Sequence, residues 1–125
     1  MKRALLVFAH GAREPAWSIP LDALAERLRC FAPSAVVRTA YLERMAPSLP
    51  DALAALADEG IYEVAVLPVF WAAQGHVTRE LPQLIAPACA RGLRVQLLPT
   101  LSELPGMLDF VARAATRSLH AAPSL

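Results

Sequence analysis

Short apolar runs alternate with helical patterns four times along this chain of 125 residues. Predicted strands cover residues 4–9, 35–40, 61–68 and 93–98, and predicted helices open near Pro15, Pro47, His76 and Leu104, the last running to about Leu119. Such alternation is typical of right-handed βαβ units. It predicts an α/β fold with a four-stranded parallel sheet, a strand order of 2-1-3-4 and helices on both faces.

Two of the predicted helices carry more detailed expectations. The first has one apolar stripe at helical spacing, which is predicted to face the sheet. The members of this stripe are Trp17, Leu21, Leu24, Leu28 and Phe31. The third helix runs to about Ala90 and contains Pro82 and Pro87. Because proline lacks an amide hydrogen, a late start or a kink is expected in this helix.

The composition limits the classes of function. The longest near-continuous apolar run, 64–73, has ten residues, whereas a bilayer span needs about 20. The first residues lack the long apolar region of a signal peptide, so a cytoplasmic protein is expected. The formal net charge is +1 without a basic tract, so neither a nucleic acid nor a membrane is an expected partner.

The remaining composition bears on packing. Apolar residues make up 56% of the chain, which predicts a surface buried in an oligomer or a sheet covered on both faces. Cys30 and Cys89 both fall in predicted helices and are expected to be small buried residues. Residues 1–125 are expected to form a single domain, with a loose tail over 120–125.

Two histidines lie at matching places in this pattern. His10 follows the first predicted strand and precedes Gly11, and His76 follows the third strand and Gly75. With a strand order of 2-1-3-4, the chain connections diverge between strands 1 and 3. Open α/β proteins bind ligands at the carboxyl ends of the strands beside such a switch point. Both imidazoles are therefore predicted to lie at one crevice.

Two acidic residues are candidates for the same crevice. Glu43 follows the second strand, where a carboxylate can ligate a metal or accept a proton. Glu80 lies four residues after His76, so a helix places both on one face. There Glu80 either orients the imidazole or pairs with Arg79 in solvent. The simpler interpretations, of His10 as a loop cap and of Glu43 as a solvated loop acid, stay open at this point.

Two imidazoles and a carboxylate at one crevice permit two kinds of chemistry. Imidazole suits divalent first-row metal ions, and histidine can also act as a base near neutral pH. Arg13 offers a planar donor fork that suits a carboxylate or a phosphate. The chain has no glycine-rich nucleotide motif. It also has no serine or cysteine in a nucleophile-elbow context, so acyl transfer is not expected.

Three segments resemble the small CbiX-type class II chelatases, a family that includes sirohydrochlorin cobaltochelatases and is related to SirB-type ferrochelatases. The matching segments are 5–13, then 41–43 with 47–49, and then 66–77 followed by Glu80 and Pro82. They occur in the family's order and span roughly residues 3–100. The chain departs from the family pattern at Ala12, where the family usually has serine, and at Glu80, where it usually has aspartate. The lost serine hydroxyl concerns a secondary hydrogen bond rather than the metal chemistry.

The resemblance implies ATP-independent insertion of Co²⁺, Fe²⁺ or Ni²⁺ into sirohydrochlorin, in cobalamin or siroheme biosynthesis. Under this interpretation His10, His76 and Glu43 hold the metal, and the two histidines also take up the pyrrole protons. Arg13 and Arg79 are candidates for binding the peripheral carboxylates of the substrate. A homodimer is implied, with no cofactor beyond the metal ion. A non-catalytic metal or tetrapyrrole carrier and a small regulatory module with an anion site remain as alternatives.

Overall fold

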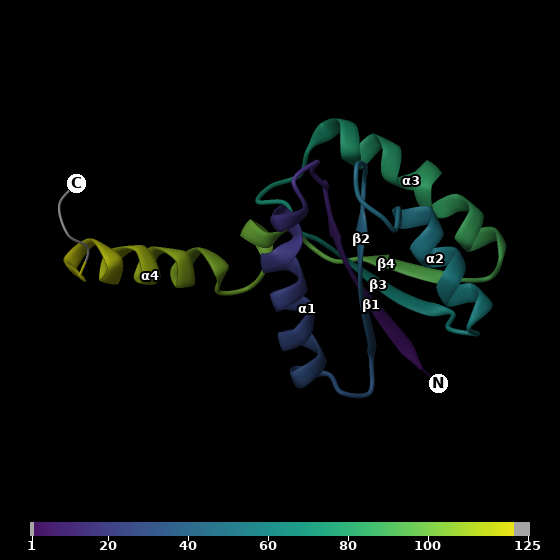
Figure 1. The fold of residues 1–125 in the computed structure, drawn as a ribbon, viewed down its shortest axis with the longest axis horizontal. Coiled ribbons are helices and arrows are strands. Elements are labelled where there is room, and N and C mark those ends of the chain that lie inside the picture. The colour runs from purple at the N-terminus through teal and green to yellow at the C-terminus, as the bar shows by residue number, and fades with distance from the viewer. Residues whose placement is uncertain (1, 122–125) are drawn as a thin grey trace.

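The computed structural model describes residues 2–121, with only the backbone described at His76. Its elements are β1 (Arg3–Ala9), η1 (Pro15–Ser18), α1 (Ile19–Phe31), β2 (Val36–Tyr41), α2 (Leu49–Asp58), β3 (Glu63–Pro68), α3 (Gly75–Ala90), β4 (Arg94–Leu97), η2 (Leu101–Glu103) and α4 (Met107–Ala121). The four strands form one parallel sheet in the order β2-β1-β3-β4 (Figure 1). The predicted sheet and strand order are confirmed.

The pairing of the strands brings three loops to one edge of the sheet. β1 lies between β2 and β3, and its end pairs Ala9 with Tyr41 and Phe8 with Pro68. β4 pairs with β3 and is shorter. The loops that follow β1, β2 and β3 therefore leave the sheet side by side, at the point where the strand order reverses.

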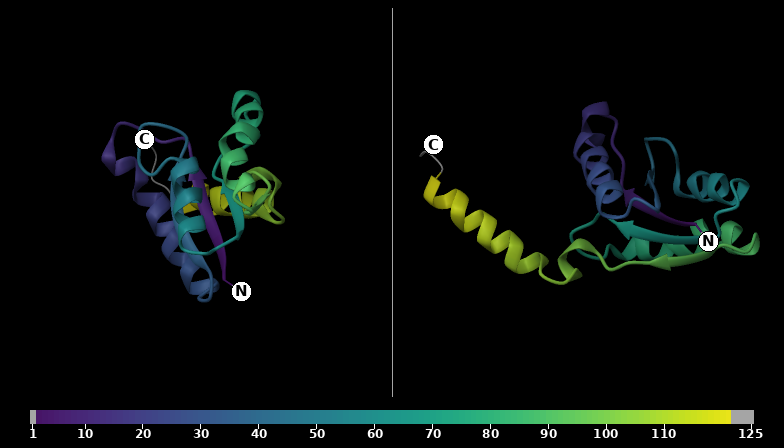
Figure 2. Two further views of the ribbon diagram at one scale, coloured as in Figure 1. Left: turned by 90° about the vertical axis from the view of Figure 1, so that its right-hand side faces the viewer. Right: turned by 90° about the horizontal axis from the view of Figure 1, so that it is seen from below.

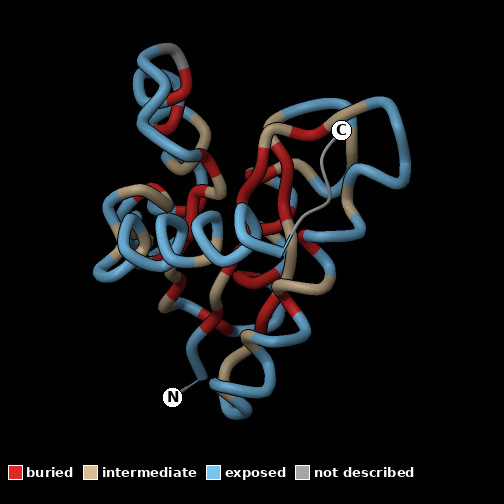
Figure 3. The backbone as a smooth tube through the Cα atoms, turned by 90° about the vertical axis from the view of Figure 1, so that its left-hand side faces the viewer, coloured by how far each residue is buried: buried red, intermediate tan, exposed pale blue. Residues whose placement is uncertain are grey.

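Helices cover both faces of the sheet, as predicted. α1 packs on one face, whereas α2 and α3 pack on the other (Figures 1 and 2). The buried residues, red in Figure 3, lie on the strands and on the sides of α1, α2 and α3 that pack against them. Among the fully buried side chains are Leu6, Phe8, Leu53 and Leu56. Each such side chain stabilises the fold by about 1.5–3 kcal/mol when it leaves water.

The first helix differs from its prediction at both ends. Pro15 opens the short helix η1, and α1 begins only at Ile19, with Pro20 in its first turn. Trp17 is 40% exposed because it lies in η1, outside the α-helical period. Phe31, the last residue of α1, is 87% exposed. The predicted stripe therefore holds for Leu21, Leu24 and Leu28 and is wrong for Trp17 and Phe31.

The third helix tolerates its prolines. α3 begins at Gly75 and continues through Pro82 and Pro87, so the expected late start does not occur. Each proline leaves the carbonyl group four residues earlier without its helical donor. Both prolines and these two earlier residues, Thr78 and Gln83, are exposed. Water can therefore satisfy the freed carbonyl groups.

The exposure of the two cysteines tests one expectation, and the length of the helices tests another. Cys30 and Cys89 are both exposed, so the expectation of buried cysteines is wrong. They lie on the solvent sides of α1 and α3. From helical periodicity alone, a partly apolar side of a helix cannot be distinguished from the stripe that packs on the sheet. Within residues 2–121 no helix is long and apolar enough to cross a membrane.

The last helix leaves the body of the molecule. α4 extends outward from η2 and covers neither face of the sheet (Figures 1 and 2). None of its residues is buried, and Leu108, Phe110 and Leu119 are 60%, 62% and 75% exposed. α4 ends at Ala121, beyond the predicted end near Leu119, and so includes the start of the expected loose tail. The rest of that tail, 122–125, lies outside the described residues.

Candidate functional site at the carboxyl edge of the sheet

Backbone hydrogen bonds join the loops that follow β1 and β2. The amide of Leu42 donates to the carbonyl oxygen of Ala9 at 2.9 Å, and the amide of Glu43 donates to that of His10 at 3.0 Å. These bonds continue the β1–β2 ladder beyond the ends of both strands. The ladder thus places His10 beside Glu43.

Gly11 allows the two loops to approach each other closely. It is buried and has a φ of +94°. A Cβ atom at this position would lie 1.8 Å from the carbonyl oxygen of Glu43. No side chain fits there without displacing the backbone of the neighbouring loop. The sequence predicts the turn at Gly11, and the structure adds this close contact as a second reason for glycine.

His10 and Glu43 form the central pair of the site. Nε2 of His10 lies 3.7 Å from Oε1 of Glu43, and their side chains are 40% and 49% exposed. Nδ1 of His10 lies 3.3 Å from the carbonyl oxygen of Gly11. When Nδ1 carries the proton and donates to this carbonyl, the Nε2 lone pair faces a carboxylate oxygen. Two such acceptors are stabilised by a proton or a cation between them.

The separation of these two atoms also fits a bound metal ion. Nitrogen and oxygen ligands lie about 2.0–2.2 Å from a first-row ion such as zinc, so two ligands of one ion are at most about 4.4 Å apart. The observed 3.7 Å between Nε2 of His10 and Oε1 of Glu43 is within this limit. The pair can therefore ligate one ion without a movement of the backbone.

Two arginines line a hollow next to this pair. Arg13 and Arg44 contribute to a hollow of about 310 Å³, together with Ser18 and Tyr41. Nε of Arg44 also lies 3.4 Å from Oε1 of Glu43. Two guanidinium groups on one hollow suit ligands that carry carboxylates.

Arg44 has no counterpart among the sequence predictions. It lies in an irregular loop with a φ of +68°, and loop residues follow no helical or strand period. Its position directly after Glu43 is the only signal that the sequence offers. Arg13, in contrast, is predicted because it follows His10 and Gly11 at the end of a strand.

The start of α3 reaches the same edge of the sheet. The amide of Val69 donates to the carbonyl oxygen of Phe8 at 2.7 Å, which extends the β1–β3 ladder. Residue 76 is the second residue of α3, so the topology places its backbone at this edge, as predicted. The contact of the His76 side chain with the pair formed by His10 and Glu43 stays a prediction.

Arg79 and Glu80 are both exposed near the start of α3. No ion pair joins them within the part of the chain that the structure describes. In that same part, which excludes the His76 side chain, no three histidine, cysteine, aspartate or glutamate side chains gather as a metal site. The described donors are thus His10 and Glu43, and the three-ligand set remains a prediction.

An ion pair with two hydrogen bonds lies away from this site. Arg38 in β2 makes two hydrogen bonds of 2.6 Å to the carboxylate of Glu59, at the end of α2. The hydrogen bonds from Arg38 lower the pKa of Glu59 below its ordinary value. The same hydrogen bonds raise the pKa of Arg38. This pair ties the edge strand to the helix and takes no part in the site.

The sheet topology and the loops at its carboxyl edge define an open α/β protein, a class in which ligands bind at the topological switch point. The chain belongs to the CbiX family, whose model matches residues 4–118. It is 28% identical over 85 residues to a sirohydrochlorin cobaltochelatase of Methanosarcina acetivorans, covering 68% of this chain and 65% of that protein. It is 32% identical over 82 residues to the enzyme of the same name from Methanocaldococcus jannaschii, covering 66% and 57%. The match therefore spans less than two thirds of these relatives.

Solved structures show the same fold. A CbiX protein from Marinobacter aquaeolei VT8 matches with a TM-score of 0.81 and 22% identity, covering 96% of this chain and 99% of that one. The sirohydrochlorin chelatase SirB from Bacillus subtilis subspecies spizizenii, solved in complex with cobalt, matches with a TM-score of 0.68 and 25% identity. That match covers 79% of this chain and 44% of SirB.

Proposed function

We propose that this protein is a chelatase that inserts a divalent metal ion into sirohydrochlorin without ATP. The observation that carries the proposal is the pair formed by His10 and Glu43, whose facing atoms are 3.7 Å apart beside a hollow lined by arginines. The family and the names of its relatives supply the reaction class. Co²⁺ and Fe²⁺ are the proposed metals, and cobalamin or siroheme synthesis is the proposed setting, in the cytoplasm.

The reaction needs a group that holds the ion and a group that takes protons. A metal ion that enters the macrocycle forms bonds to the pyrrole nitrogens, and two N–H protons leave. In our proposal, His10 and Glu43 present the ion, since an imidazole and a carboxylate both ligate first-row metals. His76, and His10 once the ion has left its Nε2 atom, share the uptake of the protons, because neutral imidazole is a base of suitable strength near neutral pH.

The arginines orient the substrate in this proposal. Sirohydrochlorin carries carboxylates around its rim, and guanidinium groups bind carboxylates through two parallel hydrogen bonds. Arg13 and Arg44 line one hollow, Arg44 also contacts Glu43, and Arg79 lies near the start of α3. We assign Arg13, Arg44 and Arg79 to the rim of the macrocycle. Glu80 is assigned to the orientation of the His76 imidazole.

Replacing the histidines tests the proposal. His10→Ala and His76→Ala are each expected to lower the rate of cobalt or iron insertion by about 100-fold or more, as is usual for the loss of a general base. The matched control is His120→Ala, since His120 lies on α4, away from the site. Insertion is followed by the absorbance of sirohydrochlorin, and circular dichroism verifies folding. Near-normal rates in both site variants would falsify the proposal.

The same assay separates an enzyme from a carrier. A chelatase yields more metallated tetrapyrrole than there is protein, whereas a carrier stops at one equivalent. A regulatory module with an anion site would bind no metal at all. Supplying Co²⁺, Fe²⁺ and Ni²⁺ in turn ranks the metals.

A single site of this kind leaves one side of a flat macrocycle open. We therefore propose that two copies of the chain assemble as a homodimer. The match to SirB covers most of this chain but less than half of SirB, which agrees with two copies corresponding to one longer relative.

A further inference from the structure

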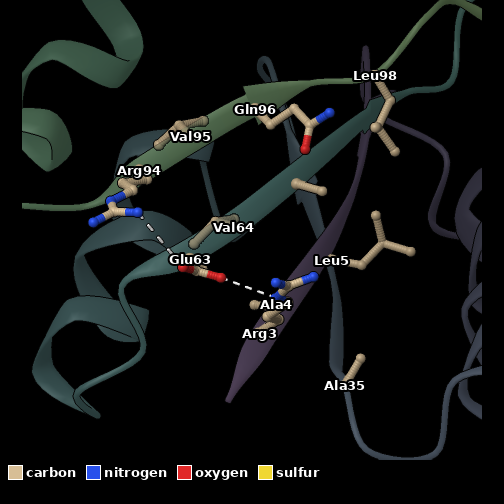
Figure 4. Close-up of a pocket in the computed structure, with 11 residues that line it drawn as sticks. Arg3, Ala4, Leu5, Ala35, Glu63, Val64, Arg94, Val95, Gln96 and Leu98 are labelled. Carbon is tan, nitrogen blue, oxygen red and sulfur yellow. Dashed lines mark hydrogen bonds and ion pairs between the residues drawn. The ribbon is translucent and has the colours of Figure 1, made fainter. Parts of the chain in front are cut away.

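The sheet face that carries α1 is covered over only part of its width. α1 packs on β1 and β2, and beside it lies an open groove of about 550 Å³ over β3 and β4 (Figure 4). Leu5, Ala65 and Gln96 are register partners across β1, β3 and β4 and line this groove. Leu5 packs in the cluster beneath α1. Since register partners point to the same face, all three side chains lie on the α1 side of the sheet.

Charged side chains border one end of the groove. Nε of Arg3 lies 2.9 Å from Oε2 of Glu63, and Nη1 of Arg94 lies 3.8 Å from Oε1 of the same carboxylate (Figure 4). The rest of the lining is largely apolar and includes Leu98. An apolar floor with a charged border is typical of a surface that receives another element.

α4 carries an apolar face that no other element within residues 2–121 covers. Its central stripe consists of Leu108, Val111, Ala115 and Leu119, at helical spacing. Leu108, Val111 and Leu119 are 60%, 39% and 75% exposed. The rest of the helix surface is mostly polar and carries Asp109, Arg113, Thr116, Arg117 and His120, with the exposed Phe110 among them. An isolated helix of about 15 residues is marginal in water, so this stripe needs a partner surface.

α4 is long enough to cover the strands beneath the groove. α4 has 15 residues, which span about 22 Å at about 1.5 Å per residue. β3 has six residues and β4 has four, so these strands span about 20 Å and about 13 Å. A helix of this length covers the β3–β4 half of the face from end to end. The small side chain of Ala65 permits a close approach there.

The exit of α4 is fixed in a direction away from its own groove. The amides of Leu101 and Ser102 in η2 donate to the carbonyl oxygens of Phe70 and Trp71, both at 2.9 Å. The amide of Met107 then donates to the carbonyl oxygen of Leu104 at 3.1 Å, which closes the turn into α4. These bonds hold η2 on the end of β3, and from there α4 points outward (Figures 1 and 2).

We propose that two copies of the chain exchange α4, so that each α4 packs its apolar stripe on the open β3–β4 face of the other copy. The helix and the groove belong to the same chain, so the exchange is reciprocal and closes with two-fold symmetry. This exchange specifies the contact within the proposed dimer. It is independent of the metal chemistry, and its tests measure molecular mass and covalent linkage rather than chelation.

A charge on the stripe tests the contact. Val111→Arg places a cation within the apolar stripe, whereas Thr116→Arg, the matched control, places it outside the stripe on the same helix. Static light scattering is expected to give twice the chain mass of 13.5 kDa for the unmodified chain and for Thr116→Arg. Val111→Arg is expected to give the single chain mass. A monomeric unmodified chain, or a dimer that survives Val111→Arg, would overturn the proposal.

Cross-linking tests which copy contributes the helix. In a background with Cys30→Ser and Cys89→Ser, one chain carries Ala65→Cys in the groove and another carries Ala115→Cys on α4. Mild oxidation of the mixed chains with diamide is expected to give a covalent heterodimer. Thr116→Cys in place of Ala115→Cys is the control and is expected to lose most of this product. A chain with both Ala65→Cys and Ala115→Cys that closes only on itself would show that α4 returns to its own groove, and would overturn the exchange.

Discussion

At the scale of single residues, the site depends on a contact between two backbones. The carbonyl oxygen of Glu43 occupies the space in which any other residue at position 11 would carry its Cβ atom. This backbone contact therefore fixes the positions of His10 and Glu43, independently of any interaction between their side chains. To ligate one ion, the two side chains would need to rotate, but the backbone would not need to move.

Gly11→Ala should separate the cost of this close contact from the cost of the turn. We expect a loss of at least about 2 kcal/mol in the free energy of unfolding, because strain at a positive φ adds to overpacking. Gly60→Ala is the control, since Gly60 has a φ of +78° and a Cβ atom added there would meet no other atom within 4 Å. Urea unfolding measures both variants. Equal losses in the two would show that the contact with Glu43 has no cost.

The arginines of the hollow should affect substrate binding more than the chemical step. Arg13→Ala and Arg44→Ala are each expected to raise KM for sirohydrochlorin roughly 10-fold with little change in kcat, because a charged hydrogen bond to the rim is made equally in the ground and transition states. Arg27→Ala on the exposed side of α1 is the control. A fall in kcat at constant KM would instead place these arginines at the reacting centre.

The sequence predicts residues of the site where they end a strand and fails where they lie in a free loop. His10 and Gly11 follow the buried strand β1, and Glu43 follows the edge strand β2, so topology alone places them at one edge. Arg44 follows no period, and its position depends on the turn that carries it. The side chain of His76 is predicted from the same topological argument as His10.

At the scale of elements, periodicity predicts which segments are helical but not how they end or what they contact. Trp17 continues the spacing of α1, yet Pro20 starts the α-helix after it and leaves Trp17 in η1. α4 shows a clear apolar stripe. The pattern indicates that this stripe packs against another surface, but it does not indicate which one. Such contacts depend on tertiary structure that a local pattern does not contain.

The bond between Arg38 and Glu59 predicts a dependence of stability on pH. Because Arg38 lowers the pKa of Glu59 from its ordinary value of 4.5, the stabilisation is present above about 4.5 and is lost as the pH falls through the lowered pKa. Glu59→Gln is therefore expected to lower the melting temperature slightly at pH 7 and to have no effect well below the lowered pKa. Thermal unfolding across this range measures the difference. Glu26→Gln, in an exposed pair within α1, is the control.

At the scale of the whole molecule, the strand order is predictable because right-handed crossovers leave few arrangements of four alternating units. The same rule predicts four helices distributed over two faces, and three of them follow it. α4 does not: it follows η2, whose amides bond to the carbonyl oxygens of Phe70 and Trp71, and it extends away from the sheet (Figures 1 and 2). Hydrogen bonds of this kind, between a loop and a strand end, leave no trace in composition or periodicity.

The detached position of α4 has a consequence for the thermodynamics of the chain. If its apolar stripe is covered only by a second copy, the folding of these 15 residues is linked to the concentration of the protein by mass action. On dilution the sheet and its three packed helices would remain folded while α4 lost its helical structure. The helical content of the chain would then depend on the concentration of the protein.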